Sequence, residues 1–452
     1  MPQFVPPPLM PDPNEEKWVA PDSSTMTRDE RYAFETTRPI VDLVKVQRMA
    51  REGSIPDGYR YTYWTLLLGT TPVMQSERAA RQEKRLAEYQ AMVADLLSGL
   101  SDIPLPLDDD PRRIDVDIPR TMPTLHFFGS HDGSPSCAAE RERQQSETFP
   151  REHAEASAAA ADEDEAQEVA GGSSATEVIA QDNSSAGPAN TSNGISQFSP
   201  NQKALRRILH LFARLNAGAG YVQGMNELVG HLMYAFCCGR GIASPQVEAD
   251  VFFSFQHLHQ FVGDNFQREL DLDATGVKGT MTAFSMLLLR VDNPLFQALE
   301  KLGMAPEYYA FRWITLMFSQ DFTTPDVLSL WDFLLSFRDD LDAIVLFTAV
   351  AMVTLVRDRV MEGNFGVVIQ MLQSYPPDVD IHTITRTAAH LMSEYGVEAA
   401  RDGRGEVRSR PVSRPSTPPA EGAGAEATGD DAKRSKGGIK GFLGGLASKL
   451  RK

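Results

Sequence analysis

The chain of 452 residues carries a formal net charge of −17 at pH 7 and a sequence pI near 5.0. This acidic balance argues against a nucleic-acid-binding protein, because phosphate contacts require clustered lysine and arginine. The three cysteines, Cys137, Cys237 and Cys238, form neither a disulfide framework nor a C-x-x-C metal spacing. No stretch reaches the ~18 apolar residues of a membrane span, and the N-terminus lacks a signal-peptide pattern. The composition therefore favours a cytoplasmic protein in a reducing compartment.

Changes in composition divide the chain into parts. Residues 1–38 are Pro-rich and polar, which predicts a poorly ordered arm. Apolar residues at helical spacing then predict one helical domain over residues 39–400. Within it, residues 129–200 are rich in Ala, Ser, Gly and acidic residues and have little periodicity, which predicts a disordered acidic insert that loops out from the domain surface. Residues 401–432 read as a disordered linker.

Residues 433–452 form a basic, amphipathic tail. Apolar residues recur there at helical spacing among lysines and arginines, a pattern typical of a helix that binds an anionic membrane surface. The candidate membrane-binding residues are Lys440, Phe442, Leu443, Leu446, Lys449 and Leu450. A helix that docks on its own domain or on another protein is the alternative. Membrane binding would add a peripheral association with endomembranes to the cytoplasmic location.

Apolar periodicity predicts helices along most of the domain. The expected helices, in chain order, cover residues 40–53, 59–68, 77–100, 204–216, 224–238, 251–261, 279–290, 294–302, 308–318, 327–337, 341–361 and 381–395. A loop is expected between residue 104 and the segment around Arg120, because of two prolines and three consecutive Asp residues. Strand-like alternation is nowhere sustained, so the sequence predicts an all-α fold.

Three short motifs stand out in this domain. They are Arg60-Tyr61-Thr62-Tyr63-Trp64, Ile114-Asp115-Val116-Asp117-Ile118-Pro119-Arg120-Thr121 and Tyr221-Val222-Gln223-Gly224-Met225-Asn226. In type and order they resemble the R-x-x-x-W, I-x-x-D-x-x-R-T and Y-x-Q-G-M-N motifs of the TBC family of Rab GTPase-activating proteins. The first pattern alone is weak, but the ordered occurrence of all three is specific. The resemblance covers roughly residues 39–400 apart from the insert, and it implies a multi-helix TBC-type domain.

This resemblance implies a GTPase activator that acts in vesicle trafficking by supplying catalytic residues in trans to a Rab-family small GTPase. The chain would not itself be a hydrolase and would carry no cofactor, because GTP and Mg²⁺ reside on the partner. Arg120 matches the arginine finger, whose permanent charge offsets the charge that builds on the phosphates. Gln223 matches a glutamine finger, whose carboxamide can orient the attacking water in place of the Gln of the Rab protein.

Other residues of the motifs are expected to support these two. Arg60, Asp117, Tyr221, Gly224 and Asn226 are candidates for positioning the fingers or binding the partner, with Asp117 expected to pair with an arginine that could be Arg60. Trp64 is more simply a core residue. Arg312, Trp331 and Asp332 are expected to be architectural.

Histidines invite a metal-site interpretation that the sequence does not favour. His126, His153, His257 and His259 lack a completing set of ligands at a suitable spacing, so no metal site is predicted.

Two other function classes remain open. A non-catalytic module could hold a GTPase or an adaptor on the same helical surface, although intact Arg120 and Gln223 argue against it. A helical scaffold with no GTPase partner would require all three motifs to be coincidental. The acidic residues between Glu140 and Glu177 in the insert could also occlude Arg120 or pair with the basic tail, which would make the insert autoinhibitory.

Overall fold

The computed structural model describes residues 26–98, 110–129, 198–216, 220–237, 241–262 and 276–402. These residues form an all-α fold, as the sequence predicts. Their one β-type pairing is an isolated antiparallel bridge between Ile40 and Met74, in the connections that flank two helices. The acidic insert, the linker and the basic tail lie almost wholly outside the described residues.

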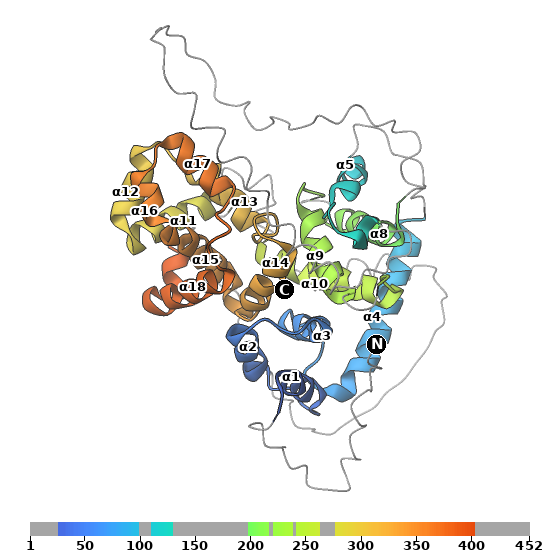
Figure 1. Cartoon of the computed structure of the whole chain (residues 1–452). Helices are drawn as coiled ribbons and strands as arrows, with labels where there is room; N and C mark the ends of the chain where they lie inside the picture. Colours follow the sequence, from blue (N-terminus) through green and yellow to red (C-terminus); the bar gives the residue numbers. More distant parts are fainter. Residues whose placement is uncertain are drawn as a thin grey trace, which may run out of the picture.

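The first part of the fold begins with four helices. They are α1 (Arg28–Thr37), α2 (Leu43–Glu52), α3 (Asp57–Leu67) and the long α4 (Gln75–Leu96). A short segment follows with α5 (Asp110–Asp117), the 3-10 turn η1 (Ile118–Arg120) and α6 (His126–Gly129). The first part ends with α8 (Pro200–Leu215), α9 (Met225–Cys237) and α10 (Pro245–Val262). Helix α10 packs against α4, α8 and α9, while α5 packs on α8 (Figure 1).

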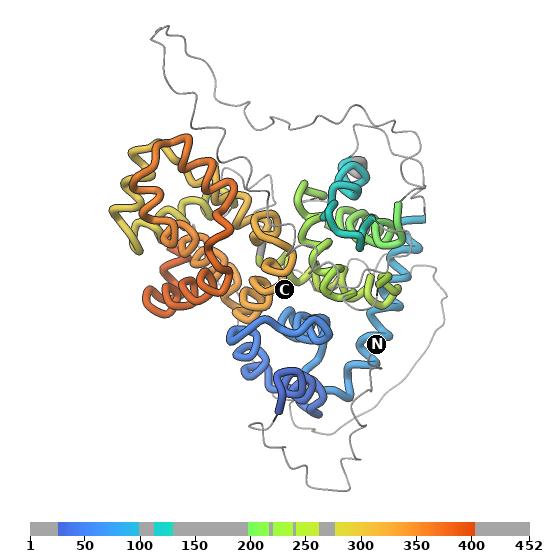
Figure 2. Tube along the Cα trace, viewed as in Figure 1, coloured from blue at the N-terminus to red at the C-terminus, as the bar shows by residue number. Residues whose placement is uncertain are grey.

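The second part gathers the remaining helices on the other side of the molecule (Figures 1 and 2). They are α11 (Val277–Val291), α12 (Asn293–Lys301), η6 (Pro306–Tyr308), α13 (Ala310–Thr315), α14 (Thr324–Leu335), η7 (Arg338–Asp340), α15 (Leu341–Leu355), α16 (Arg357–Glu362), α17 (Phe365–Gln373), α18 (Ile381–Tyr395) and η8 (Val397–Ala400). The nearly all-apolar α15 is its central helix and packs along α18.

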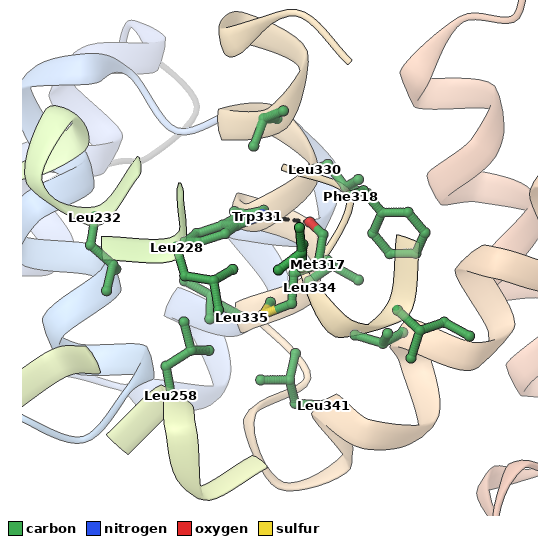
Figure 3. Packing of buried hydrophobic residues seen from close by; sticks show 14 of the residues in the cluster. Leu228, Leu232, Leu258, Met317, Phe318, Leu330, Trp331, Leu334, Leu335 and Leu341 are labelled. Atoms are coloured by element: carbon green, nitrogen blue, oxygen red, sulfur yellow. Dashed lines mark hydrogen bonds between the residues drawn. The ribbon is translucent and has the colours of Figure 1, made fainter. Parts of the chain in front are cut away.

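Helix α14 joins the two parts. It packs against α2, α3 and α9 on one side and against α15 and α18 on the other. At this junction Leu228 and Leu232 of α9 and Leu258 of α10 meet Trp331 and Leu335 of α14 (Figure 3). Burial of this continuous apolar cluster stabilises both parts together. Helix α14 therefore holds the first part of the fold against the second part.

Capping residues explain where several helices begin. Thr27 and Ser199 each form a capping box, with Glu30 and Gln202 respectively three residues later. Each box satisfies backbone N–H groups that the first turn of a helix leaves unpaired.

The structure corrects several sequence-based boundaries. Helix α1 lies inside the predicted Pro-rich arm, and its Tyr32 and Glu35 are buried against the domain. Helix α5 occupies part of the loop expected before Arg120, and the single helix expected over residues 341–361 is divided at Val356 into α15 and α16. Helix α17 was not predicted. At the two edges of the predicted insert, Gly129 ends α6 and Ser199 caps α8.

Within the described ranges, no helix is both long and apolar enough to span a lipid bilayer.

Candidate functional site

The Arg120 segment is an exposed tip on a buried base. Helix α5 ends at Asp117, and the short η1 turn brings Arg120 to the surface as its last residue. Asp117, Ile118 and Thr121 are buried around it. The Thr121 hydroxyl donates to the Asp117 carbonyl at 2.9 Å, and the Thr121 N–H donates to the Ile118 carbonyl at 3.2 Å. The backbone that carries the guanidinium is thus held in place while the side chain faces solvent.

A buried ion pair fixes this segment to the domain. Asp115, on α5, accepts a bidentate pair of hydrogen bonds from Arg206 on α8, including one of 3.0 Å from Nη2. His210, one turn further along α8, lies 3.3 Å from the same carboxylate. Burial favours the neutral form of Asp115, but hydrogen bonds from His210 and Arg206 outweigh it and lower its pKa below the usual range. The ionised Asp115 therefore anchors α5 on α8.

The Gln223 segment is a second exposed tip. Tyr221 and Gly224 are buried, whereas Gln223 between them is exposed immediately before α9 begins. Gly224 adopts φ +100, and a Cβ there would lie 2.4 Å from a methyl carbon of Leu316. Only glycine allows this backbone to turn so close to the segment after α13. The turn that presents Gln223 therefore requires the Gly224 of the motif.

Side-chain hydrogen bonds join the two tips. The Tyr221 hydroxyl lies 2.8 Å from Asp117 Oδ2, to which it donates, and 3.1 Å from Asn226 Oδ1. Asn226 donates from Nδ2 to the Thr121 hydroxyl at 2.9 Å and accepts from the Gly224 N–H at 3.1 Å. Four of the five predicted positioning residues, Asp117, Tyr221, Gly224 and Asn226, thus lie in one network beneath Arg120 and Gln223. These bonds hold the two turns, and with them the backbones of Arg120 and Gln223, in a fixed mutual arrangement.

The network beneath Arg120 contains the carboxyl group of Asp117. Burial raises the pKa of Asp117 above its usual range, while the Tyr221 hydrogen bond and the charges of Arg120 and Arg113 oppose this shift. Burial, with the nearby Asp117, also raises the pKa of Tyr221, so its hydroxyl remains a hydrogen-bond donor at neutral pH. The positive charge of Arg120 thus partly offsets the effect of burial on the pKa of Asp117.

Arg60 is placed elsewhere, which corrects its predicted role. Its side chain is only 2% exposed, and its guanidinium pairs with Asp332 of α14 at 3.1 Å and with Asp57. Trp64 Nε1 donates to the same Asp332 carboxylate at 2.7 Å. Arg60 therefore neither pairs with Asp117 nor reaches the surface where a partner could bind. The first motif ties α3 to α14 and belongs to the core.

The other architectural assignments agree with the structure. Trp331 is fully buried and donates from Nε1 to the Met317 carbonyl at 2.9 Å (Figure 3). Arg312 donates to the Asp321 carboxylate and to the Gln373 carbonyl, linking α13 to the end of α17. Neither residue lies in the network of the two tips.

Sequence reasoning missed several residues that build the site. Thr121 is a position of the second motif to which the sequence analysis gave no role, yet its hydroxyl links the Arg120 turn to Asn226. Asp115, Arg206 and His210 anchor the Arg120 segment, yet the sequence holds no signal that pairs residues 91 positions apart. Glu227, the residue after the third motif, is buried beside Asp117.

No group of three or more potential ligand side chains within the described ranges is arranged to hold a metal ion. Burial lowers the pKa of both His257 and His259 to about 4, so both are neutral at pH 7. His153 and the six candidate membrane-binding residues of the tail lie outside the described residues.

A model of the Rab-GTPase-TBC domain matches residues 137–361, a range that contains Gln223 but not Arg120. The mouse and human proteins named TBC1 domain family member 13 are each 37% identical to this chain over 190 residues, which is 42% of this chain and 47% of theirs. GTPase-activating protein gyp1 of Schizosaccharomyces pombe is 21% identical over 329 residues, covering 70% of this chain and 50% of that protein. This chain thus spans about half the length of these relatives.

The crystal structure of the Ypt/Rab-GAP domain of Gyp1p shares the fold. It superposes with a TM-score of 0.58 at 20% identity, covering 81% of this chain and 97% of that domain. The helical architecture is therefore that of a TBC domain. The family match and the relatives show that this chain contains a Rab-GTPase-TBC domain.

Proposed function

We propose that this chain is a GTPase-activating protein for a Rab-family small GTPase. The observation that carries the proposal is the pair of exposed side chains, Arg120 and Gln223, on turns joined by the hydrogen bonds of Asp117, Tyr221 and Asn226. Arg120 and Gln223 are exposed, while the turns that carry them are buried and hydrogen-bonded to each other. This arrangement suits side chains that must enter the active site of another protein. The names of the similar proteins, among them a GTPase-activating protein and a Ypt/Rab-GAP domain, support this reading.

Arg120 would supply charge to the partner. Hydrolysis of GTP builds negative charge on the phosphates as the bond to the γ-phosphate loosens. A guanidinium is permanently charged and presents several donors in one plane, so it can offset that charge in a site from which water is excluded. Arg120 is the motif arginine whose side chain is exposed; Arg60 is buried. We therefore assign the arginine finger to Arg120.

Gln223 would position the nucleophile. A carboxamide oxygen can accept a hydrogen bond from the attacking water while its NH₂ group donates to a phosphate oxygen. Because the turn around Gly224 fixes the backbone, Gln223 can enter the GTPase site with little loss of backbone entropy. This chain would then supply the glutamine that a Rab protein otherwise provides itself. GTP and Mg²⁺ would stay on the partner, and no cofactor on this chain would be needed.

The test is GTP hydrolysis by a panel of purified, GTP-loaded Rab proteins under single-turnover conditions. The wild-type chain is compared with Arg120→Lys and Gln223→Ala. We expect the wild type to accelerate one or a few Rab proteins, and both substitutions to abolish the acceleration while binding is retained. Binding of a GTP-loaded Rab without acceleration would identify the alternative, a non-catalytic module on the same surface.

The membrane role of the basic tail is a separate part of the proposal. A cytoplasmic activator whose substrate is attached to endomembranes gains from a peripheral lipid contact, which the positive charge of the tail would provide. Co-sedimentation with vesicles containing phosphatidylserine tests it. Replacement of Lys440 and Lys449 by Glu should abolish co-sedimentation, and unchanged binding would contradict the role.

A further inference from the structure

Glu227 connects the two sides of the finger site. It lies in the first turn of α9, four residues after Gln223, and its side chain is only 8% exposed. Its carboxylate accepts a hydrogen bond from the backbone N–H of Met122, two residues after Arg120. It also accepts one from the side chain of Gln320, in the segment that follows α13. One carboxylate thus joins three segments that are distant in the sequence.

Both segments held by Glu227 contain strained backbone. Met122 has φ +44, and Met317 and Phe318 have φ values of +48 and +60. These are the non-glycine residues with positive φ among those that the structure describes. Bulky side chains avoid this region, so such a conformation persists only where surrounding contacts hold it. The hydrogen bonds of Glu227 to Met122 and to Gln320 are contacts of this kind.

The same segments surround the finger turns. Leu316 packs against Gly224 of the Gln223 turn, as the 2.4 Å approach to a Cβ there demonstrates. On α9, Gly230 allows Thr121 and Met122 of the Arg120 segment to pack closely, because a Cβ would lie 2.9 Å from Thr121 Cγ2. A change at Glu227 would therefore act on the positions of both fingers.

The charge of Glu227 is adjustable near neutral pH. Burial is the main cause that raises its pKa to about 7, and the neighbouring Asp117 adds to the effect, whereas the two hydrogen bonds oppose it. The titratable and charged groups around this cluster are Asp117, Arg113, Arg120, Tyr221 and His231. His231 bonds to the Glu227 carbonyl, and because burial lowers its pKa to about 4, it stays neutral in this range.

We propose that the ionised carboxylate of Glu227 is a positioning element for both fingers, clamping the Arg120 turn to the segment that supports Gln223. Protonation of Glu227 weakens the clamp, because a neutral carboxyl group is a poorer acceptor for the two donors. Acceleration of GTP hydrolysis then increases as pH rises through neutrality. This inference rests on the proposed function.

The test is the pH dependence of acceleration at saturating activator, measured from pH 6 to 8 with a responsive Rab. The ionised fraction of a group with a pKa near 7 rises from about one tenth to about nine tenths over this range, so acceleration by the wild type should rise up to about ninefold. Glu227→Gln keeps the size of the side chain but cannot ionise. We expect it to give a flat profile near the low-pH value of the wild type, with little change in affinity for the Rab.

Glu248→Gln is the matched control. Glu248 is also a buried glutamate, only 5% exposed, but its carboxylate accepts hydrogen bonds from Tyr89 of α4 and Arg207 of α8. This variant should keep the pH slope of the wild type, which would exclude general loss of a buried acid as the cause of a flat profile. The flat profile of Glu227→Gln on the same Rab would exclude titration of the Rab as the cause of the slope. A wild-type slope retained in Glu227→Gln would overturn the inference.

A second measurement does not depend on activity. Hydrogen–deuterium exchange of a peptide covering residues 118–125 should be faster in Glu227→Gln than in the wild type at pH 8, and equal to it in Glu248→Gln. Equal exchange in all three proteins would overturn the clamp. If the wild type accelerates no Rab but this exchange difference is present, the proposed function fails while the clamp stands.

Discussion

Arg60 and Arg120 are both arginines of motifs shared with the same family, but the structure gives them opposite environments. Arg60 is 2% exposed and paired with Asp332 and Asp57, whereas Arg120 is exposed on a short turn. Desolvation of a charge is costly unless the charge is paired, so the two paired carboxylates around Arg60 are a structural requirement. Beneath Arg120 the buried groups hold the backbone and leave the guanidinium available. A motif arginine can therefore be assigned a role only from its burial and its partners.

The largest effect is expected at the exposed arginine. Arg120→Ala should reduce GTP hydrolysis by the responsive Rab by about 10³-fold or more, since an arginine finger contributes ~10³ to 10⁵ in rate. This corresponds to roughly 4 to 7 kcal/mol of barrier. Because the side chain is exposed, the melting temperature should stay close to that of the wild type. Single-turnover hydrolysis and calorimetry measure the two quantities, and a large loss of stability would contradict the comparison.

The buried arginine should show the reverse pattern. Arg60→Ala leaves Asp332 buried without its main counter-charge, so the free energy of unfolding should fall by about 3–5 kcal/mol. The activity per folded molecule should stay near that of the wild type. Arg48→Ala, at an exposed pair with Glu52, is the control and should change stability little. Urea denaturation compares the variants, and an Arg60→Ala protein as stable as the Arg48→Ala protein would refute the core role.

Substitution of Gln223, like that of Arg120, should lower activity rather than stability. Gln223→Ala should slow hydrolysis by about 10²- to 10³-fold, in the range seen when one preorganised polar group is removed from a catalytic site. Its affinity for a GTP-loaded Rab should be nearly unchanged. Titration calorimetry with a Rab bearing a non-hydrolysable GTP analogue separates these effects. A loss confined to affinity would make Gln223 a binding residue only.

Gly224 tests whether the turn itself matters. Gly224→Ala adds the cost of positive φ and a contact of 2.4 Å with Leu316, and overpacking of this kind typically costs about 1–3 kcal/mol. Gly303→Ala is the matched control, because Gly303 also has positive φ, +72, but open space around its Cβ position. We expect lower activity and stability in Gly224→Ala than in Gly303→Ala. Equal behaviour of the two variants would show that close packing of this turn is dispensable.

The sequence predicted the local features well. Apolar periodicity identified most of the helices and hence the all-α fold, because that signal is carried by neighbouring residues. Arg120 and Gln223 were singled out by motif, and the structure places both on exposed turns above one network. Helix α1 was missed because prolines and polar residues before it dominate the composition of the first 38 residues.

Side-chain pairs between residues distant in the chain could not be predicted from the sequence. Arg60 and Asp332 are 272 positions apart, and the partner of a buried charge is decided by how α3 and α14 pack. The same holds for Glu227, whose bonds to Met122 and Gln320 depend on the backbone course of three segments. A single sequence contains no periodic signal for such contacts, so it singled out Arg120 and Gln223 but not the residues that hold their turns.

The central claim is that this chain supplies both fingers in trans. The most direct measurement uses a responsive Rab whose own active-site glutamine is replaced by alanine, with hydrolysis followed in a single turnover. We expect the wild-type chain still to accelerate hydrolysis by this Rab, and Gln223→Ala and Arg120→Lys not to. Loss of acceleration with the wild-type chain on the altered Rab, combined with normal acceleration of the natural Rab by Gln223→Ala, would contradict it.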